Sequence, residues 1–180
     1  MPKPHEYKPQ SMADRFIRAA AIDADNWRDP QHDLEAIQLA NQEERSAIEN
    51  FLIRRGIQHF IDAEALATLD TPTARQALIA AFKTGTSEIR AAVAYLTPHL
   101  IDDVSRTTDL IGRIHECDAY NGLTLTLSEI ETNHPTTVIQ AMLRRIACDP
   151  GVAAVHFAGL LLYLHGQASE PFDWDQRPFL

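Results

Sequence analysis

Hydrophobic positions along the chain recur with the period of an α-helix, and one stretch is apolar on every side. Between Pro150 and Leu164 there is no charged side chain. Asp149 can accept hydrogen bonds at a helix start, Pro150 fits the first turn, and Gly166 fits a left-handed C-terminus. A helix that is apolar all round has to be covered by protein or lipid. The apolar run Val152–Leu164 is shorter than the roughly 20 residues of a membrane span, so we predict a buried central helix that Asp149 caps and in which Pro150 is the first helical residue.

The first part of the chain carries the start and stop signals of further helices. Ser11 can cap a helix over Ser11–Ile22. The pattern over Asp33–Arg55 fits either one long helix or two helices with a break near Asn41. Asn41 and Glu44 have the spacing of a capping box, which favours a fresh helix start there. A short helix is predicted over Asp62–Leu69.

From Thr71 onward the helix signals recur at a regular interval. Helix starts fall at Pro72, Asp102 and Pro135, which are 30 and 33 residues apart. Second helices are predicted over Ser87–Pro98 and Tyr120–Glu131. The apolar positions expected to face inward are Ala74, Ala77, Leu78, Ala81, Phe82, Val104, Thr107, Ile111, Ile114, Val138, Ile139, Met142, Leu143 and Ile146. A helix pair repeating at this length is typical of an α-solenoid. The predicted fold class is therefore all-α, with antiparallel helix pairs stacked as a short solenoid.

The segment Leu123–Leu127 fits this scheme less well, because leucine and threonine alternate there with the period of a strand. It also follows Asn121-Gly122, which is a turn signal. We predict a helix because the neighbouring pairs determine its place in the repeat. A lone strand would leave its backbone groups unpaired.

The passage EALATLDTPTARQALIAAFKTGTSEIRAAVAYL resembles a HEAT repeat of the short bacterial type. Thr71-Pro72 matches the turn between the two helices, and Ile89-Arg90-Ala91-Ala92 matches the second-helix motif. The stretch DPGVAAVHFAGLLLYL repeats the second-helix pattern, with Ala153 where the motif has Arg. The resemblance covers Glu64–Gly166 and implies a HEAT-like fold. It also implies a grooved surface for protein partners, although some HEAT-like proteins act on nucleic acid or are cofactor-handling enzymes.

Composition is that of a globular protein of 180 residues, with 45% hydrophobic and 23% charged residues. The expected organisation is a disordered lead-in over residues 1–10, a single helical domain over 11–166 and a capping tail over 167–180. The tail is aromatic, with Phe172, Trp174 and Phe179. No apolar targeting segment is evident at the N-terminus and only two cysteines occur, so we expect a cytoplasmic protein with both thiols free.

Acidic side chains are concentrated in the middle repeat. The chain has a net charge of −9, which argues against nucleic acid or an anionic membrane as partner. Between Asp102 and Glu131 there are seven acidic side chains against two basic ones. We predict that this repeat binds a basic protein; the alternative is a solvated helix face. The predicted partner-binding residues are Asp102, Asp103, Glu116, Asp118, Tyr120, Glu129 and Glu131.

Candidates for catalysis or metal binding are few. His115-Glu116 with Asp118 is similar to the His-Glu pairs of HEAT-like di-iron hydroxylases, but those enzymes need several such pairs. His156 is interpreted as a hydrogen-bonded core residue. We therefore predict no catalytic residue, metal site or cofactor. The predicted function is a non-catalytic protein-binding module that resembles bacterial immunity proteins, which neutralise a cognate basic toxin. The alternatives are a HEAT-like hydroxylase or lyase, or a scaffold subunit.

Overall fold

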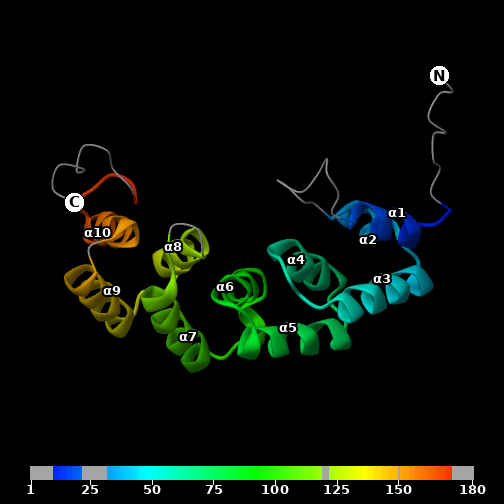
Figure 1. Cartoon of the computed structure of the whole chain (residues 1–180), viewed down its shortest axis with the longest axis horizontal. Helices are drawn as coiled ribbons and strands as arrows, with labels where there is room; N and C mark the ends of the chain where they lie inside the picture. The colour runs from blue at the N-terminus through cyan, green and yellow to red at the C-terminus, as the bar shows by residue number, and fades with distance from the viewer. Residues whose placement is uncertain (1–9, 22–31, 119–121, 150, 172–180) are drawn as a thin grey trace, which may run out of the picture. The chain divides into compact units, whose positions relative to one another are not determined.

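A computed structural model describes residues 10–21, 32–118, 122–149 and 151–171 (Figure 1). These residues form ten α-helices and one short 3₁₀ helix, and no β-strand occurs among them. The predicted all-α class is confirmed. The chain divides into two compact units, Met1–Leu78 and Ile79–Leu180, with the boundary inside one helix and within the predicted domain. In the described part of the chain, no helix is both long and apolar enough to cross a membrane.

The first unit is built around five helices. They are α1 (Met12–Ala19), α2 (Leu34–Leu39), α3 (Gln42–Arg55), α4 (Phe60–Leu69) and the start of α5 (Pro72–Thr84). Helix α1 packs against α2 and α3, and α4 also packs against α2 and α3. Their core consists of fully buried side chains, among them Phe16, Ile37, Ile48, Leu52 and Leu66.

Local sequence signals set the ends of these helices. The Ser11 hydroxyl accepts a hydrogen bond from the Asp14 N–H at 3.0 Å, as predicted. Asn41 and Glu44 form a reciprocal capping box, so the break between α2 and α3 is confirmed. Gly56 ends α3 with a φ of 78°, a left-handed conformation that glycine adopts without a Cβ penalty.

The second unit contains the end of α5 and six further elements. These are α6 (Ser87–Leu96), the 3₁₀ helix η1 (Pro98–Leu100), α7 (Asp103–Glu116), α8 (Leu123–Thr132), α9 (Thr136–Cys148) and α10 (Val152–Leu164). Figure 1 shows α8 between α6 and α10, with α7 beside α9, and these neighbours are in contact. Two layers of alternating helices result. The ambiguous segment Leu123–Leu127 is helical and opens α8.

Helix α10 ends as predicted, just before the left-handed Gly166, but it begins at Val152 with Gly151 rather than Asp149 as its N-cap. It packs against α8 and α9. Its buried side chains include Phe157, Leu160 and Leu161, which join the core of the second unit. Its first residue, Val152, is 60% exposed. The apolar helix is therefore covered along most of its length, but its N-terminus meets solvent.

Two residues predicted to face inward lie at the surface instead. Val104 is 76% exposed and Leu143 is 53% exposed. The buried side of α7 is formed by Leu110, Arg113 and Ile114. At about 100° per residue, Val104 lies roughly 180° around the helix from Arg113. Of the positions predicted to face inward in α7, Ile114 is buried and Thr107 and Ile111 are partly buried, whereas Leu110 and Arg113, which were not predicted there, are buried.

Candidate protein-binding site

The first two predicted site residues lie at the N-terminus of α7. Asp102 caps the helix by accepting a hydrogen bond from the Ser105 N–H at 2.9 Å. The Ser105 side chain and then the backbone N–H groups lower the pKa of the Asp102 carboxyl. Asp103 lies in the first turn, where a carboxylate interacts favourably with the helix dipole. Both side chains are exposed, so each is open to a partner while it stabilises the helix.

Glu129 is inside the protein. Only 1% of its side chain is exposed, and it pairs with Arg106 of α7 at 2.6 Å and with Arg113. Arg113 is itself fully buried and also donates to the Thr126 hydroxyl at 3.3 Å. Glu129 is therefore not part of an exposed acidic face, because its carboxylate forms ion pairs with two arginines between α7 and α8.

The same ion-pair series continues to Glu116. Asp109 pairs with Arg113 at 2.6 Å and with Arg90 of α6 at 2.5 Å. Arg90 in turn pairs with Glu116 at 2.7 Å. Glu116 keeps an exposed side chain, but its charge is neutralised within the unit. Three helices of the second unit are thus linked by one continuous series of arginines and carboxylates.

The remaining predicted residues differ in position. Glu131 is exposed on α8 and has no ion pair with the described residues. Asp118 is exposed just after α7, where it forms an isolated bridge with Gly122. Tyr120 lies outside the described residues. The structure therefore does not bring all seven predicted residues together. Glu131 lines a pocket between α8 and α10, and Glu116 lines a separate groove beside α7.

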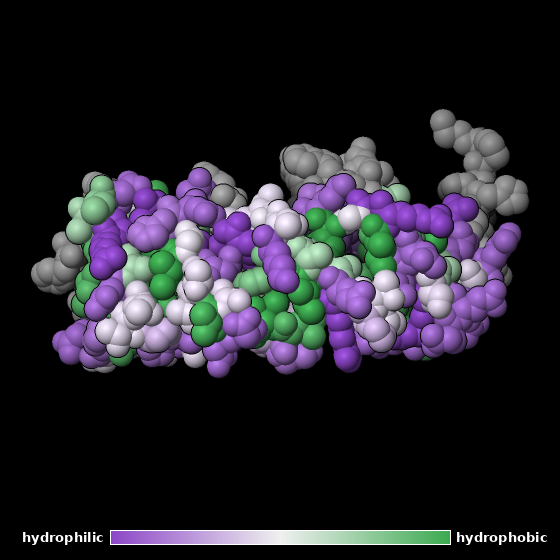
Figure 2. Space-filling view, turned by 90° about the horizontal axis from the view of Figure 1, so that it is seen from below, coloured by the Kyte–Doolittle hydropathy of each residue, from purple (hydrophilic) through white to green (hydrophobic). Residues whose placement is uncertain are grey.

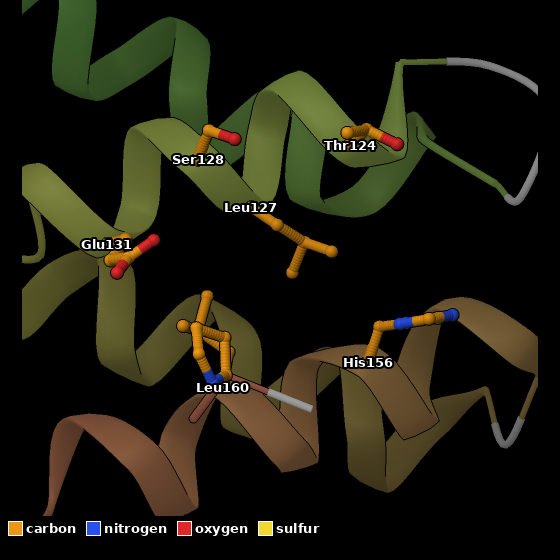
Figure 3. Close-up of a pocket in the computed structure, with 7 residues that line it drawn as sticks. Thr124, Leu127, Ser128, Glu131, His156 and Leu160 are labelled. Carbon is orange, nitrogen blue, oxygen red and sulfur yellow. The ribbon is translucent and has the colours of Figure 1, made fainter. Parts of the chain in front are cut away.

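That pocket lies between α8 and α10 and has a volume of about 170 Å³ (Figure 3). It is lined by Thr124, Leu127, Ser128 and Glu131 of α8, by His156 and Leu160 of α10, and by Pro171. In Figure 3 Leu127 points from α8 into the space between the two helices. Apolar side chains therefore form the middle of the groove, and polar ones lie around them.

The polar groups of the groove are spread out. Figure 3 shows Glu131 and His156 at opposite ends of the groove and the Ser128 hydroxyl directed away from α10. A nucleophile, base and acid have to be within hydrogen-bond reach of one another to act together, and these three side chains are not arranged in that way. An apolar groove with a carboxylate at one end instead suits the aliphatic stem and charged head of a lysine or arginine.

The candidates for metal and thiol chemistry are also separated. His115 is exposed at the end of α7, while Glu116 is held by Arg90. Within the described ranges, no group of three or more His, Cys, Asp or Glu side chains is placed to hold a metal ion. Cys117 is buried and Cys148 is exposed, and both are free, as predicted.

The first unit holds a buried pair that the sequence did not indicate. His32 Nε2 lies 2.9 Å from Asp62 Oδ1, and neither side chain is exposed. The other carboxylate oxygen of Asp62 accepts the N–H groups of Gln58 and His59 at 3.0 Å. Burial raises the pKa of Asp62, but the hydrogen bond to His32, the backbone N–H groups and Arg55 together lower it below its ordinary value. The hydrogen bond between His32 and Asp62 therefore connects the first turn of α4 to the residue before the N-cap of α2.

No protein-family model, curated protein or solved structure matches the chain. What the protein does is therefore inferred from its own residues.

Proposed function

We propose that the chain is a non-catalytic protein-binding module, and that the groove between α8 and α10 receives a basic side chain of the partner. The observation that carries this proposal is the charge that remains at the surface of the second unit. Internal ion pairs neutralise most of its cations, and several carboxylates are left in solvent.

The charges of the second unit divide into two groups. Arg90, Arg106, Arg113 and Arg145 are each paired with carboxylates. Among the described residues of this unit, the cations without an ion pair are Lys83 and Arg144, whereas the carboxylates without one include Glu88, Asp102, Asp103, Glu131 and Glu170. An excess of exposed negative charge attracts a basic protein and raises its rate of encounter.

The groove between α8 and α10 provides a specific contact site, which long-range electrostatic attraction alone does not provide. Leu127 offers apolar surface between the helices, with the buried Leu160 beneath it, and Glu131 offers an unpaired carboxylate at the rim. A lysine or arginine can lay its methylene groups on Leu127 while its charge meets Glu131. Charged contacts of this kind give orientation and specificity more than affinity.

The class of partner that we propose is a basic toxin, which the chain would neutralise as an immunity protein. The HEAT-like resemblance and the net charge of −9 support this assignment. Binding would then consist of covering a basic functional surface of the toxin, and it would require no catalytic group on this chain.

The groove is tested by titrating the full chain with fluorescently labelled oligolysine and oligoglutamate and following anisotropy. We expect oligolysine to bind, with an affinity that falls as salt rises. Glu131→Gln should weaken binding about two- to five-fold, which is the range for an exposed ion pair. The matched control is Glu88→Gln, which removes an exposed carboxylate from α6 of the same unit. Equal effects of the two substitutions, or equal binding of oligoglutamate, would remove the support for this groove.

A further inference from the structure

The outer side of α7 carries a second surface with different character. Figure 2 views the molecule from below, the side on which α7 and α9 lie in Figure 1, and shows hydrophobic residues at the surface among polar ones. Val104 of α7 is 76% exposed, more than any other large hydrophobic residue in the described part of the chain. It lines a groove of about 460 Å³ together with Phe82, Lys83, Thr108 and Gly112, among others.

Gly112 has no evident role within the chain. It lies in the interior of α7, where glycine lowers helix stability relative to alanine. Its backbone is helical rather than left-handed. A Cβ atom added at Gly112 would meet no atom within 4 Å other than those of its chain neighbours and the nearby backbone of its own helix. Neither backbone conformation nor internal packing requires glycine here, and the space beside it is open to another molecule.

The spacing of Val104 and Gly112 along α7 would let them contact each other across a two-fold axis between two copies of the chain. Val104, Thr108 and Gly112 are spaced by four residues along α7, so they lie on one ridge of the helix. With a rise of 1.5 Å per residue, Val104 and Gly112 are about 12 Å apart along the axis, and Thr108 is midway. If two α7 helices cross in antiparallel fashion at Thr108, Val104 of each copy lies over Gly112 of the other. The exposed side chain then fills the open space.

The charges follow the same symmetry. Asp103 lies beside Val104 at the N-terminal end of α7. Arg90 donates to the Gly85 carbonyl at 3.3 Å and to Glu116 at 2.7 Å, so the turn after α5 lies at the C-terminal end of α7. Lys83, two residues before Gly85, is therefore at that end. Neither Lys83 nor Asp103 has an ion pair with the described residues. The two-fold axis brings Lys83 of one copy toward Asp103 of the other.

We propose that this chain forms a symmetric homodimer through α7, with Val104 of each copy packed at Gly112 of the other and Asp103 facing Lys83. The interface is isologous, the commonest kind in soluble oligomers. It lies on the side of the second unit away from the proposed α8–α10 groove and does not depend on what that groove binds. One helix pair buries little surface, so the dimer is weak and forms as protein concentration rises.

The dimer is tested by analytical ultracentrifugation of the full chain over a range of concentrations, with circular dichroism as a check on folding. We expect a reversible monomer–dimer equilibrium that Val104→Asp shifts to monomer. The matched control is Leu143→Asp, which changes a 53% exposed leucine of α9 and should leave the equilibrium unchanged. A wild-type chain that stays monomeric up to about 1 mM, or equal effects of the two substitutions, would overturn the proposal.

Charge reversal tests the symmetry itself. Lys83→Glu and Asp103→Lys should each weaken dimerisation by about tenfold, because each places two like-charged pairs across the interface. The double variant should recover dimerisation, since opposite charges face one another again. This recovery requires the two residues to be opposed across the interface. A double variant as weak as the single variants would exclude the antiparallel arrangement.

Discussion

Arg113 of α7 and Glu129 of α8 form an ion pair in which neither side chain is more than 1% exposed. Arg106 also binds Glu129, and Asp109 binds Arg113 at 2.6 Å, so each charge has more than one partner. Removing one member of a buried ion pair destabilises the fold, because it leaves the other charge buried without its partner. The pair therefore fastens α8 to α7, and the acidic residue predicted to meet a partner belongs to the interior.

Replacing Glu129 is expected to destabilise the protein strongly. Glu129→Gln keeps the shape of the side chain but removes the buried carboxylate that Arg106 and Arg113 share, so that Asp109 is the carboxylate still paired with Arg113. Removing one member of a buried pair costs about 3–5 kcal/mol of the free energy of unfolding. Urea unfolding followed by circular dichroism at 222 nm measures this loss.

The control lies two residues further along the same helix. Glu131→Gln removes an exposed carboxylate without an ion pair and should change the free energy of unfolding by no more than about 0.5 kcal/mol. Similar stabilities of the Glu129 and Glu131 variants would mean that the buried pair does not form. The sequence predicted a partner-binding role for both glutamates, whereas in the structure Glu129 is buried and Glu131 is exposed.

Helix boundaries were predictable because their signals are local. Asn41 and Glu44 of the capping box are three residues apart, and α10 ends just before Gly166, the left-handed residue predicted there. Even Leu123–Leu127, which alternates as a strand would, was assigned correctly from its place between neighbouring helix pairs. The two helix ends needed only the preferences of residues at a helix terminus, and Leu123–Leu127 needed the spacing of the neighbouring helices along the chain.

The interior pairs were not predictable, because they depend on which helices meet. His32 and Asp62 are 30 residues apart, and Arg113 and Glu129 are 16 apart. From sequence alone, a charged residue at an inward position is assigned to the surface, because its partner on another helix is not known. The same limit explains Val104, whose apolar character suggested the core although it lies on the far side of α7 from Arg113.

Acid stability is expected to depend on Asp62. Its pKa in the folded protein is below the ordinary value, because the hydrogen bond to His32, two backbone N–H groups and Arg55 outweigh the effect of burial. The carboxylate therefore stabilises the fold above about pH 4, the pKa of an unfolded aspartate. As the pH falls from there toward the lower folded value, the unfolded chain takes up a proton first and this stabilisation is lost.

Asp62→Asn isolates this contribution. The variant should be less stable than the parent at pH 7, and the difference in free energy of unfolding should shrink as the pH falls below about 4. Urea titrations at several pH values between 3 and 7 provide the measurement. A difference that stays constant over this range would show that the Asp62 carboxyl has the same pKa in both states.

The two thiols should react at very different rates. Burial raises the pKa of Cys117, although Arg145 and Arg113 oppose the shift, and its sulfur is inaccessible. Cys148 is exposed at the end of α9. With Ellman's reagent at pH 8 we expect one fast and one slow thiol, because only an accessible thiolate attacks. Cys148→Ser should remove the fast phase and Cys117→Ser the slow one; the reverse assignment would contradict the packing of α7.

Helix α10 offers two apolar positions with opposite surroundings. Leu161 is buried against α8 and α9, so Leu161→Asp places an unpaired carboxylate in the core of the second unit and should prevent folding at neutral pH. Val152 is 60% exposed in the first turn of the same helix. There Val152→Asp places a carboxylate at a helix N-terminus, where it should be neutral or stabilise by about 0.3–1 kcal/mol. Helicity at 222 nm and thermal melting distinguish the two variants. If both variants fold and melt like the parent, α10 does not pack as described; if both unfold, its N-terminus is covered rather than open to solvent.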